Sequence, residues 1–125
     1  MFYKYSLEIP QQTLESDPVE MKITLPNGVI TEVNICFPDG CFGLAKVKII
    51  HNEFQIFPTN PEKWFAWNNY CISFKEDYKL PENFNLLKLK GYNDDDSYSH
   101  TIVFRFGVKG EWRLAFEALG EEVII

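Results

Sequence analysis

The residues that could carry chemistry in this chain are few, with two histidines and three cysteines among 125 residues. His51 and His100 do not form a pair at helical or hairpin spacing, so they do not predict a metal site. Cys36 and Cys41 could supply two zinc ligands, but no second pair follows them, and two small residues bracketing a turn is the simpler interpretation. Neither a glycine-rich phosphate loop nor a nucleophile elbow is present. We therefore expect no cofactor, no metal and no enzymatic activity.

An acidic segment, Asn93–Asp96, offers clustered oxygen ligands of the kind that Ca²⁺ requires. It lacks the spaced ligands and the closing glutamate of an EF-hand loop. A solvated hairpin tip is therefore the favoured interpretation, with calcium binding as the alternative.

The aromatic segment Trp64-Phe65-Ala66-Trp67 is the sharpest indication of a contact surface. Trp and Tyr are enriched at protein interfaces, and exposed indole rings also stack on the faces of sugars. The rings could instead fold back and cap the open end of the domain. A cap, a protein contact and a carbohydrate platform all remain open as interpretations.

The elements that must position these residues are eight short segments of alternating apolar and polar residues, each closed by proline, glycine or asparagine. They predict strands at Phe2–Ile9, Val19–Leu25, Val29–Phe37, Leu44–Ile50, Glu53–Phe57, Tyr70–Phe74, Phe84–Gly91 and His100–Val108. Pro26-Asn27-Gly28 predicts a hairpin turn, because Asn and Gly accept the positive φ of tight turns. The stretches 58–69 and 75–83 predict loops. Eight strands at this spacing predict an all-β antiparallel β-sandwich, a single jelly roll, with an immunoglobulin-like sandwich as the alternative.

The two ends of the chain offer further contact candidates. Tyr3 and Tyr5 lie on one face of the N-terminal strand. Residues 111–119 predict a short helix that Gly120 ends. The chain then closes on the apolar β-formers Val123, Ile124 and Ile125, which predict pairing with an edge strand of the same subunit or of a neighbour.

These patterns divide the chain into a sandwich domain, residues 1–110, and a C-terminal extension, residues 111–125, that packs on its own or a neighbouring subunit. The net charge of −6 and the isoelectric point near 4.9 argue against nucleic acid as a partner. No segment reaches the roughly 18 apolar residues that span a bilayer. The odd number of cysteines suits reduced thiols better than a disulfide framework, and no secretory segment opens the chain, so we expect folding in the cytoplasm.

Several turn and loop signatures resemble a known group of proteins. They are Ile9-Pro10, Asp17-Pro18-Val19-Glu20, Gly28-Val29-Ile30, Phe37-Pro38-Asp39-Gly40-Cys41, Gly43-Leu44-Ala45, Phe57-Pro58-Thr59-Asn60-Pro61 and Trp64-Phe65. Over roughly the first 108 residues the chain is similar to small, uncharacterised proteins from viral and phage-like gene clusters of bacteria and archaea. The resemblance implies a virion component built on a single jelly roll.

The expected function is thus a non-enzymatic structural virion protein, a capsid, vertex or decoration subunit, that assembles with itself and with other virion proteins. A carbohydrate- or host-surface-binding module, such as a phage receptor-binding or tail component, is the alternative. An intracellular enzyme using Cys71 or His100 is a distant third. The interface candidates are Trp64, Phe65, Trp67, Tyr3, Tyr5, Val123, Ile124 and Ile125.

Overall fold

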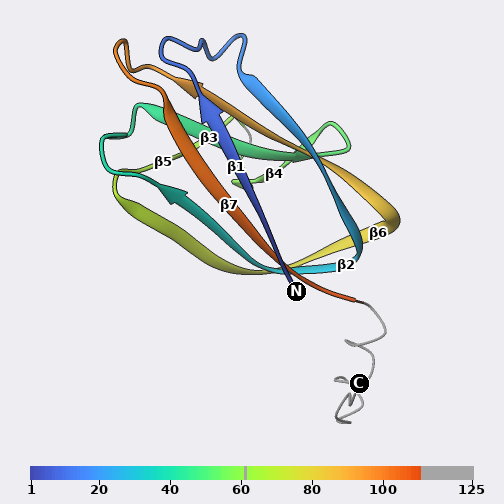
Figure 1. Cartoon of the computed structure of the whole chain (residues 1–125). Helices are drawn as coiled ribbons and strands as arrows, with labels where there is room; N and C mark the ends of the chain where they lie inside the picture. The colour runs from blue at the N-terminus through green and yellow to red at the C-terminus, as the bar shows by residue number, and fades with distance from the viewer. Residues whose placement is uncertain (61, 111–125) are drawn as a thin grey trace.

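The structure is a computed structural model that describes residues 1–60 and 62–110. In these residues the chain is entirely β, with seven antiparallel strands in one sheet (Figure 1). The strands are β1 (Phe2–Ile9), β2 (Val19–Phe37), β3 (Ala45–His51), β4 (Phe54–Phe57), β5 (Phe65–Ala66), β6 (Tyr70–Asn93) and β7 (His100–Lys109). Their order across the sheet is β1-β7-β2-β6-β3-β4, and β5 pairs with β3 beside this path. The prediction of an all-β antiparallel fold is confirmed.

Two strands are much longer than the sequence predicted. β2 runs through residues 26–28, where a hairpin turn was expected, and β6 runs through residues 75–83, where a loop was expected. Both predictions are wrong, and each merges two predicted strands into one. The short strand β5 lies inside the predicted loop 58–69, which brings the total to seven strands instead of eight.

The Pro26-Asn27-Gly28 segment bends β2 instead of reversing it. The register of β2 against β6 shifts between Pro26 and Gly28, and Asn27 Nδ2 donates to the Pro81 carbonyl at 3.0 Å. A Cβ at Gly28 would collide with the carbonyl oxygen of Lys109, so glycine is what lets β7 approach here. The strand continues because distant segments pair with it beyond the bend, and the local sequence does not contain that information.

In the polar stretch of β6, inward and outward side chains alternate up to Leu80. Phe74, Tyr78 and Leu80 point inward, while Lys75, Asp77 and Lys79, which alternate with them, are exposed. The bend that follows is closed by the buried Asn85, whose amide donates to the carbonyls of Leu25 at 3.2 Å and Glu82 at 2.8 Å. Satisfying these carbonyls lets a bent backbone stay away from water.

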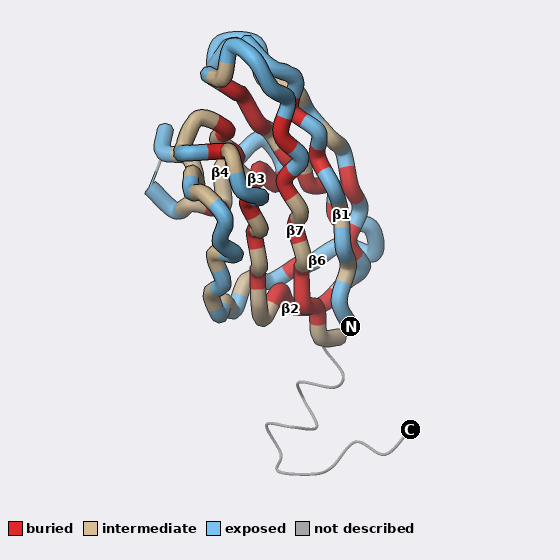
Figure 2. The backbone as a smooth tube through the Cα atoms, turned by 60° about the vertical axis from the view of Figure 1, so that its left-hand side comes forward, coloured by how far each residue is buried: buried red, intermediate tan, exposed pale blue. Residues whose placement is uncertain are grey.

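The bends in β2 and β6 fold the sheet over itself, so its two halves enclose one core (Figures 1 and 2). Residues 19–26 of β2 pair with 84–91 of β6, and residues 28–37 pair with 70–80. Across the core, Ile9 of β1 lies on Gly91 of β6, where an added Cβ would be 2.5 Å from the Ile9 Cδ1. Figure 2 shows more buried and less buried residues in alternation along β1 and along most of β7, as this arrangement requires.

Two of the three cysteines form a disulfide. Cys36 of β2 and Cys71 of β6 are register partners with an S–S distance of 2.08 Å. The expectation of three reduced thiols is therefore wrong for this pair. Cys41 is the remaining free cysteine, and it is fully buried in the core, where a thiol packs like a small apolar side chain.

The predicted helix at 111–119, the apolar residues Val123, Ile124 and Ile125, and the extension 111–125 as a whole lie outside the described residues.

Candidate functional site

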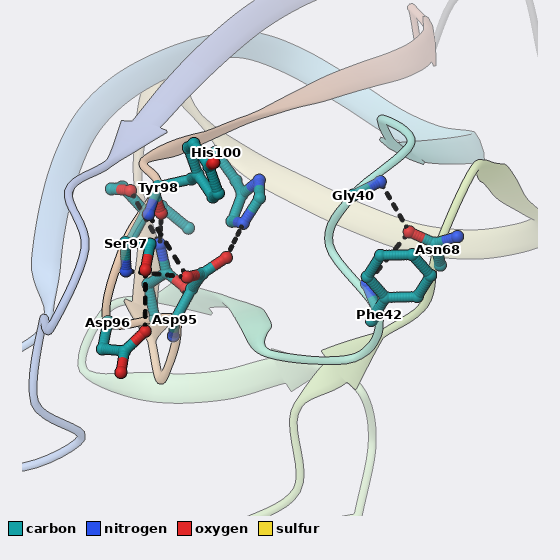
Figure 3. Close-up of polar contacts among 10 residues, drawn as sticks. Gly40, Phe42, Asn68, Asp95, Asp96, Ser97, Tyr98 and His100 are labelled. Atoms are coloured by element: carbon teal, nitrogen blue, oxygen red, sulfur yellow. Dashed lines mark hydrogen bonds and ion pairs between the residues drawn. The ribbon is translucent and has the colours of Figure 1, made fainter.

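Three loops meet at one end of the molecule, and we call this surface the loop end: residues 38–44, 67–70 and 94–99. Backbone hydrogen bonds join them, from Gly43 N to Trp67 O at 3.2 Å, from Asn69 N to Pro38 O at 3.2 Å and from Asp94 N to Leu44 O at 3.0 Å. The Asn68 side chain adds two more, since its Oδ1 accepts from Gly40 N and Phe42 N, both at 2.9 Å (Figure 3). These hydrogen bonds hold the three loops of the loop end in place relative to one another.

The buried side chain of Asn93 connects this surface to the end of β1. Its Nδ2 donates to Ile9 O at 3.2 Å and to Tyr98 O at 3.0 Å, and its Oδ1 accepts from Asp95 N at 2.9 Å. The side chain is fully buried, so these bonds replace the water that the backbone groups would otherwise need. Asn93 thus ties the end of β1 to the loop 94–99.

Asp95 organises the acidic turn. Its carboxylate accepts from Ser97 N at 2.9 Å, from Tyr98 N at 3.2 Å and from His100 Nε2 at 2.9 Å. The pKa of Asp95 is held below its ordinary value of 3.8, because these hydrogen bonds stabilise the ionised carboxylate. The bond from the Ser97 backbone N–H has the largest effect, followed by the bond from His100. In the described residues no group of three or more His, Cys, Asp and Glu side chains could hold a metal ion.

An open hollow of about 460 Å³ lies between these loops. Its floor includes the side chain of His100, and its rim carries Phe42 and Tyr98, which are 72% and 70% exposed. Figure 3 shows the Asp95–His100 contact on one side and Phe42 with Asn68 on the other. This volume lies within the range of pockets that bind small molecules.

The structure separates the three aromatic residues of the predicted contact segment. Trp64 packs edge-on against Tyr92 with ring centroids 4.7 Å apart, and Lys48 Nζ lies 4.2 Å from the Trp64 ring centroid. Phe65 stacks on Phe74 at 5.8 Å. Trp67 remains 54% exposed beside Tyr70. Two of the three rings therefore cover the domain, and Trp67 alone faces outward at the loop end.

The sheet ends at β1, and no described strand pairs with the outer edge of β1. Tyr3 and Tyr5 point inward and pack against the core, with the Tyr5 ring 6.3 Å from that of Phe106. The residues that alternate with them, including Lys4, Ser6 and Glu8, are exposed. What this edge offers to a partner is its backbone and these outward side chains.

The cysteines and histidines are not arranged as a nucleophile and its base. Burial, followed by the nearby Asp39 and Asp95 charges, raises the pKa of the Cys41 thiol, and Cys71 is held in the disulfide. His51 contacts the Tyr78 hydroxyl through Nδ1 at 2.6 Å, while its buried Nε2 has no partner in the described part of the chain. Burial lowers the pKa of His51 below its ordinary value of 6.5, because a charged ring is disfavoured away from water.

A second, smaller hollow of about 270 Å³ lies beside the β4–β5 region. Phe57, Phe65 and Phe74 line it together with Pro58, Thr59 and Glu76. Its walls are rings that already pack on one another, with Phe57 and Phe74 5.3 Å apart. It offers fewer polar groups than the hollow at the loop end.

Phe42, Tyr98 and Asn68 were not predicted as site residues. The sequence contains a pattern that could have indicated two of them as exposed aromatic residues. Phe42 lies between the turn glycines Gly40 and Gly43, and Tyr98 lies between two serines that follow three aspartates. An aromatic residue inside such a turn has no strand face to bury it. The amide of Asn68 carried no signal, because its partners belong to a loop more than twenty residues away.

No protein-family model matches the sequence, and no curated protein is significantly similar to it. Within the described residues, no helix has the length and apolar character needed to cross a membrane. The geometry of the two surfaces therefore carries the functional argument.

Proposed function

We propose that this chain is a non-enzymatic structural protein that associates with itself, as a capsid, vertex or decoration subunit of a virus particle. The observation that carries the proposal is the outer edge of β1, with which no described strand pairs; β1 is eight residues long, and its pairing with β7 contains no proline and no bulge. Monomeric proteins usually shorten, cover or distort such edges, because an unpaired strand is a template for another chain. An edge left regular is best explained by a strand that pairs with it.

The exposed face of β1 favours a second copy of the same strand. In an antiparallel pair of β1 strands with Ser6 on the two-fold axis, Lys4 of each copy lies opposite Glu8 of the other. Opposite charges facing each other across antiparallel strands are favourable, and a symmetric pair forms the contact twice. The same register places Ser6 opposite Ser6, where two small side chains meet without a clash. This complementarity supports a homodimer that continues the sheet from one subunit to the next.

The finer architecture that we propose is a β-sandwich of the jelly-roll class. Its support is the bend in β2 and β6, through which each strand contributes to both halves of the folded sheet. We propose that the protein folds in the cytoplasm and acts in the released particle. An oxidising exterior would suit the Cys36–Cys71 disulfide.

The test is the oligomeric state of charge variants, measured by size-exclusion chromatography with light scattering over a range of concentrations. Lys4→Glu would place two glutamates opposite each other twice per dimer, and we expect at least tenfold weaker dimerisation. The double variant Lys4→Glu with Glu8→Lys restores the pairing and should restore the dimer. Lys79→Glu, an exposed lysine on β6, serves as the matched control. A wild-type monomer at all concentrations would overturn the proposal.

The register has its own test. Ser6→Cys would place two thiols across the two-fold axis, and under mild oxidation we expect a covalent dimer on a non-reducing gel. Lys79→Cys is the control, because it exposes one thiol away from the edge. Equal cross-linking of both variants would show random collision and contradict the register.

A further inference from the structure

The hollow at the loop end is unexplained by the fold or by pairing at the β1 edge. Phe42 and Tyr98 are 72% and 70% exposed on its rim, so neither ring supports the core. Phe42 also has a positive φ of 46°, a conformation that side chains other than glycine adopt at a cost. The Asn68 amide holds this backbone in place through Gly40 N and Phe42 N. The chain therefore fixes an aromatic ring at the mouth of a hollow that the ring does not stabilise.

Two side chains of the hollow, those of His100 and Asp39, each have an acceptor atom without a hydrogen bond to a described residue. His100 donates Nε2–H to Asp95, so in the neutral ring its other nitrogen, Nδ1, is an acceptor. Nδ1 makes no hydrogen bond to a described residue, although the His100 side chain is only 7% exposed (Figure 3). Asp39 is exposed in the same hollow and uses one carboxylate oxygen, Oδ1, to accept from Asn68 at 3.3 Å. A ligand with several hydroxyl donors would satisfy Nδ1 and the second Asp39 oxygen together.

We infer that this hollow binds a neutral sugar, a hexose ring that lies against Phe42 or Tyr98 and donates hydroxyl groups to Asp39 and His100. The apolar face of a pyranose matches an exposed aromatic ring, and its edge carries the donors. An acidic sugar is disfavoured, because two carboxylates, those of Asp39 and Asp95, line the hollow. A cationic ligand is the competing class, but the Asp95 carboxylate is already occupied by three donors.

This site is independent of self-association, since it uses the loop end and leaves the β1 edge untouched. It also differs from the carbohydrate platform that was one of three interpretations of the aromatic segment, because Trp64 and Phe65 pack on the domain. Of that segment, Trp67 alone stands outward at the loop end.

The test is a titration of the full-length, ¹⁵N-labelled protein with methyl β-glucopyranoside, methyl β-galactopyranoside and methyl α-mannopyranoside, followed by NMR. We expect saturable shifts for at least one glycoside, confined to the amides of Gly40, Phe42, Ser97, Tyr98 and His100. Choline chloride is titrated in parallel as a probe for the cationic class. Shifts with choline alone, or no saturable shift with any glycoside, would overturn the inference.

Variants locate the site. Phe42→Ala, Tyr98→Ala and Asp39→Asn remove one rim ring or the carboxylate charge, and we expect the responding glycoside to bind at least fivefold more weakly to Asp39→Asn and to one ring variant. Phe84→Ala is the matched control, because Phe84 is an aromatic residue exposed by 82% on β6, outside the lining of the hollow. An equal loss in Phe84→Ala, or unchanged binding in all three rim variants, would contradict the assignment.

Discussion

No described strand pairs with the outer edge of β1, whereas backbone hydrogen bonds join the loops of the loop end and leave side chains exposed there. At the edge, recognition requires only another extended strand, and outward charges such as Lys4 and Glu8 select the register. At the loop end, backbone hydrogen bonds join residues 38–44 to residues 67–70 and to residues 94–99. A ligand there must fit side chains. These differences are the basis of the two proposals, self-association at the β1 edge and a small ligand at the loop end.

The largest effect that we expect comes from the residue that joins these two surfaces. Asn93→Ala leaves Ile9 O, Tyr98 O and Asp95 N without their buried partner. Each such group costs about 1–3 kcal/mol when left unsatisfied, so we expect a loss of about 3 kcal/mol in the free energy of unfolding. Urea denaturation measures it, with the exposed Asn83→Ala as control.

Asn93→Ala should also weaken both β1 dimerisation and the order of the loop 94–99. If the variant unfolds before either can be measured, amide hydrogen exchange in Asn93→Ser reports the same two regions. Perturbation of one region alone would contradict the view that Asn93 links them.

A smaller and more local effect is expected for Asn68→Ala. It removes the acceptor of Gly40 N and Phe42 N on a half-buried residue, which corresponds to about 1–2 kcal/mol. Amide exchange at Gly40 and Phe42 should accelerate, while light scattering should show unchanged dimerisation. A change in dimerisation would break the separation between the loop end and the edge.

The smallest effect is a dependence on pH. Because Ser97 N and His100 hold the Asp95 pKa below 3.8, the ionised carboxylate stabilises the folded state above that pH, and this contribution is lost as the pH falls through the lower, folded pKa. Asp95→Asn should therefore be less stable than wild type at pH 7, with a difference that shrinks below pH 3.8. Thermal unfolding at a series of pH values measures it. A difference that stays constant into acid would assign the effect to packing.

The sequence contained enough to locate β1, β3, β4 and β7, because each alternates apolar and polar residues between clear breaks. It misled at Pro26-Gly28, where turn chemistry is identical for a hairpin and for a bend. The difference lies in β6 and in the Lys109 carbonyl, which are distant in sequence.

The candidate site was predicted less well than the fold. The Trp64–Trp67 segment was correctly singled out as aromatic, but the partners that cover Trp64 and Phe65, such as Tyr92 and Phe74, depend on sheet register. The disulfide was missed for a similar reason. An odd number of cysteines favoured reduced thiols, and only the pairing of β2 with β6 brings Cys36 and Cys71 together. The alternation of apolar and polar residues locates the strands, whereas the pairing of distant strands determines which side chains lie together in a site.

The long ladder between β2 and β6 also sets how the chain can fold. Near its end at Phe37 and Tyr70, the partners Cys36 and Cys71 are 35 residues apart in sequence, whereas Val19 and Gly91 at the other end are more than twice as far apart. Pairing first the residues that are closest in sequence costs the least chain entropy. We therefore expect the β2–β6 pairs to form first at the loop end and then past the bends toward Val19. Folding dominated by such distant contacts is slow, on the order of milliseconds to seconds. A newly made chain therefore spends that interval with the edges of an incomplete sheet open to other chains.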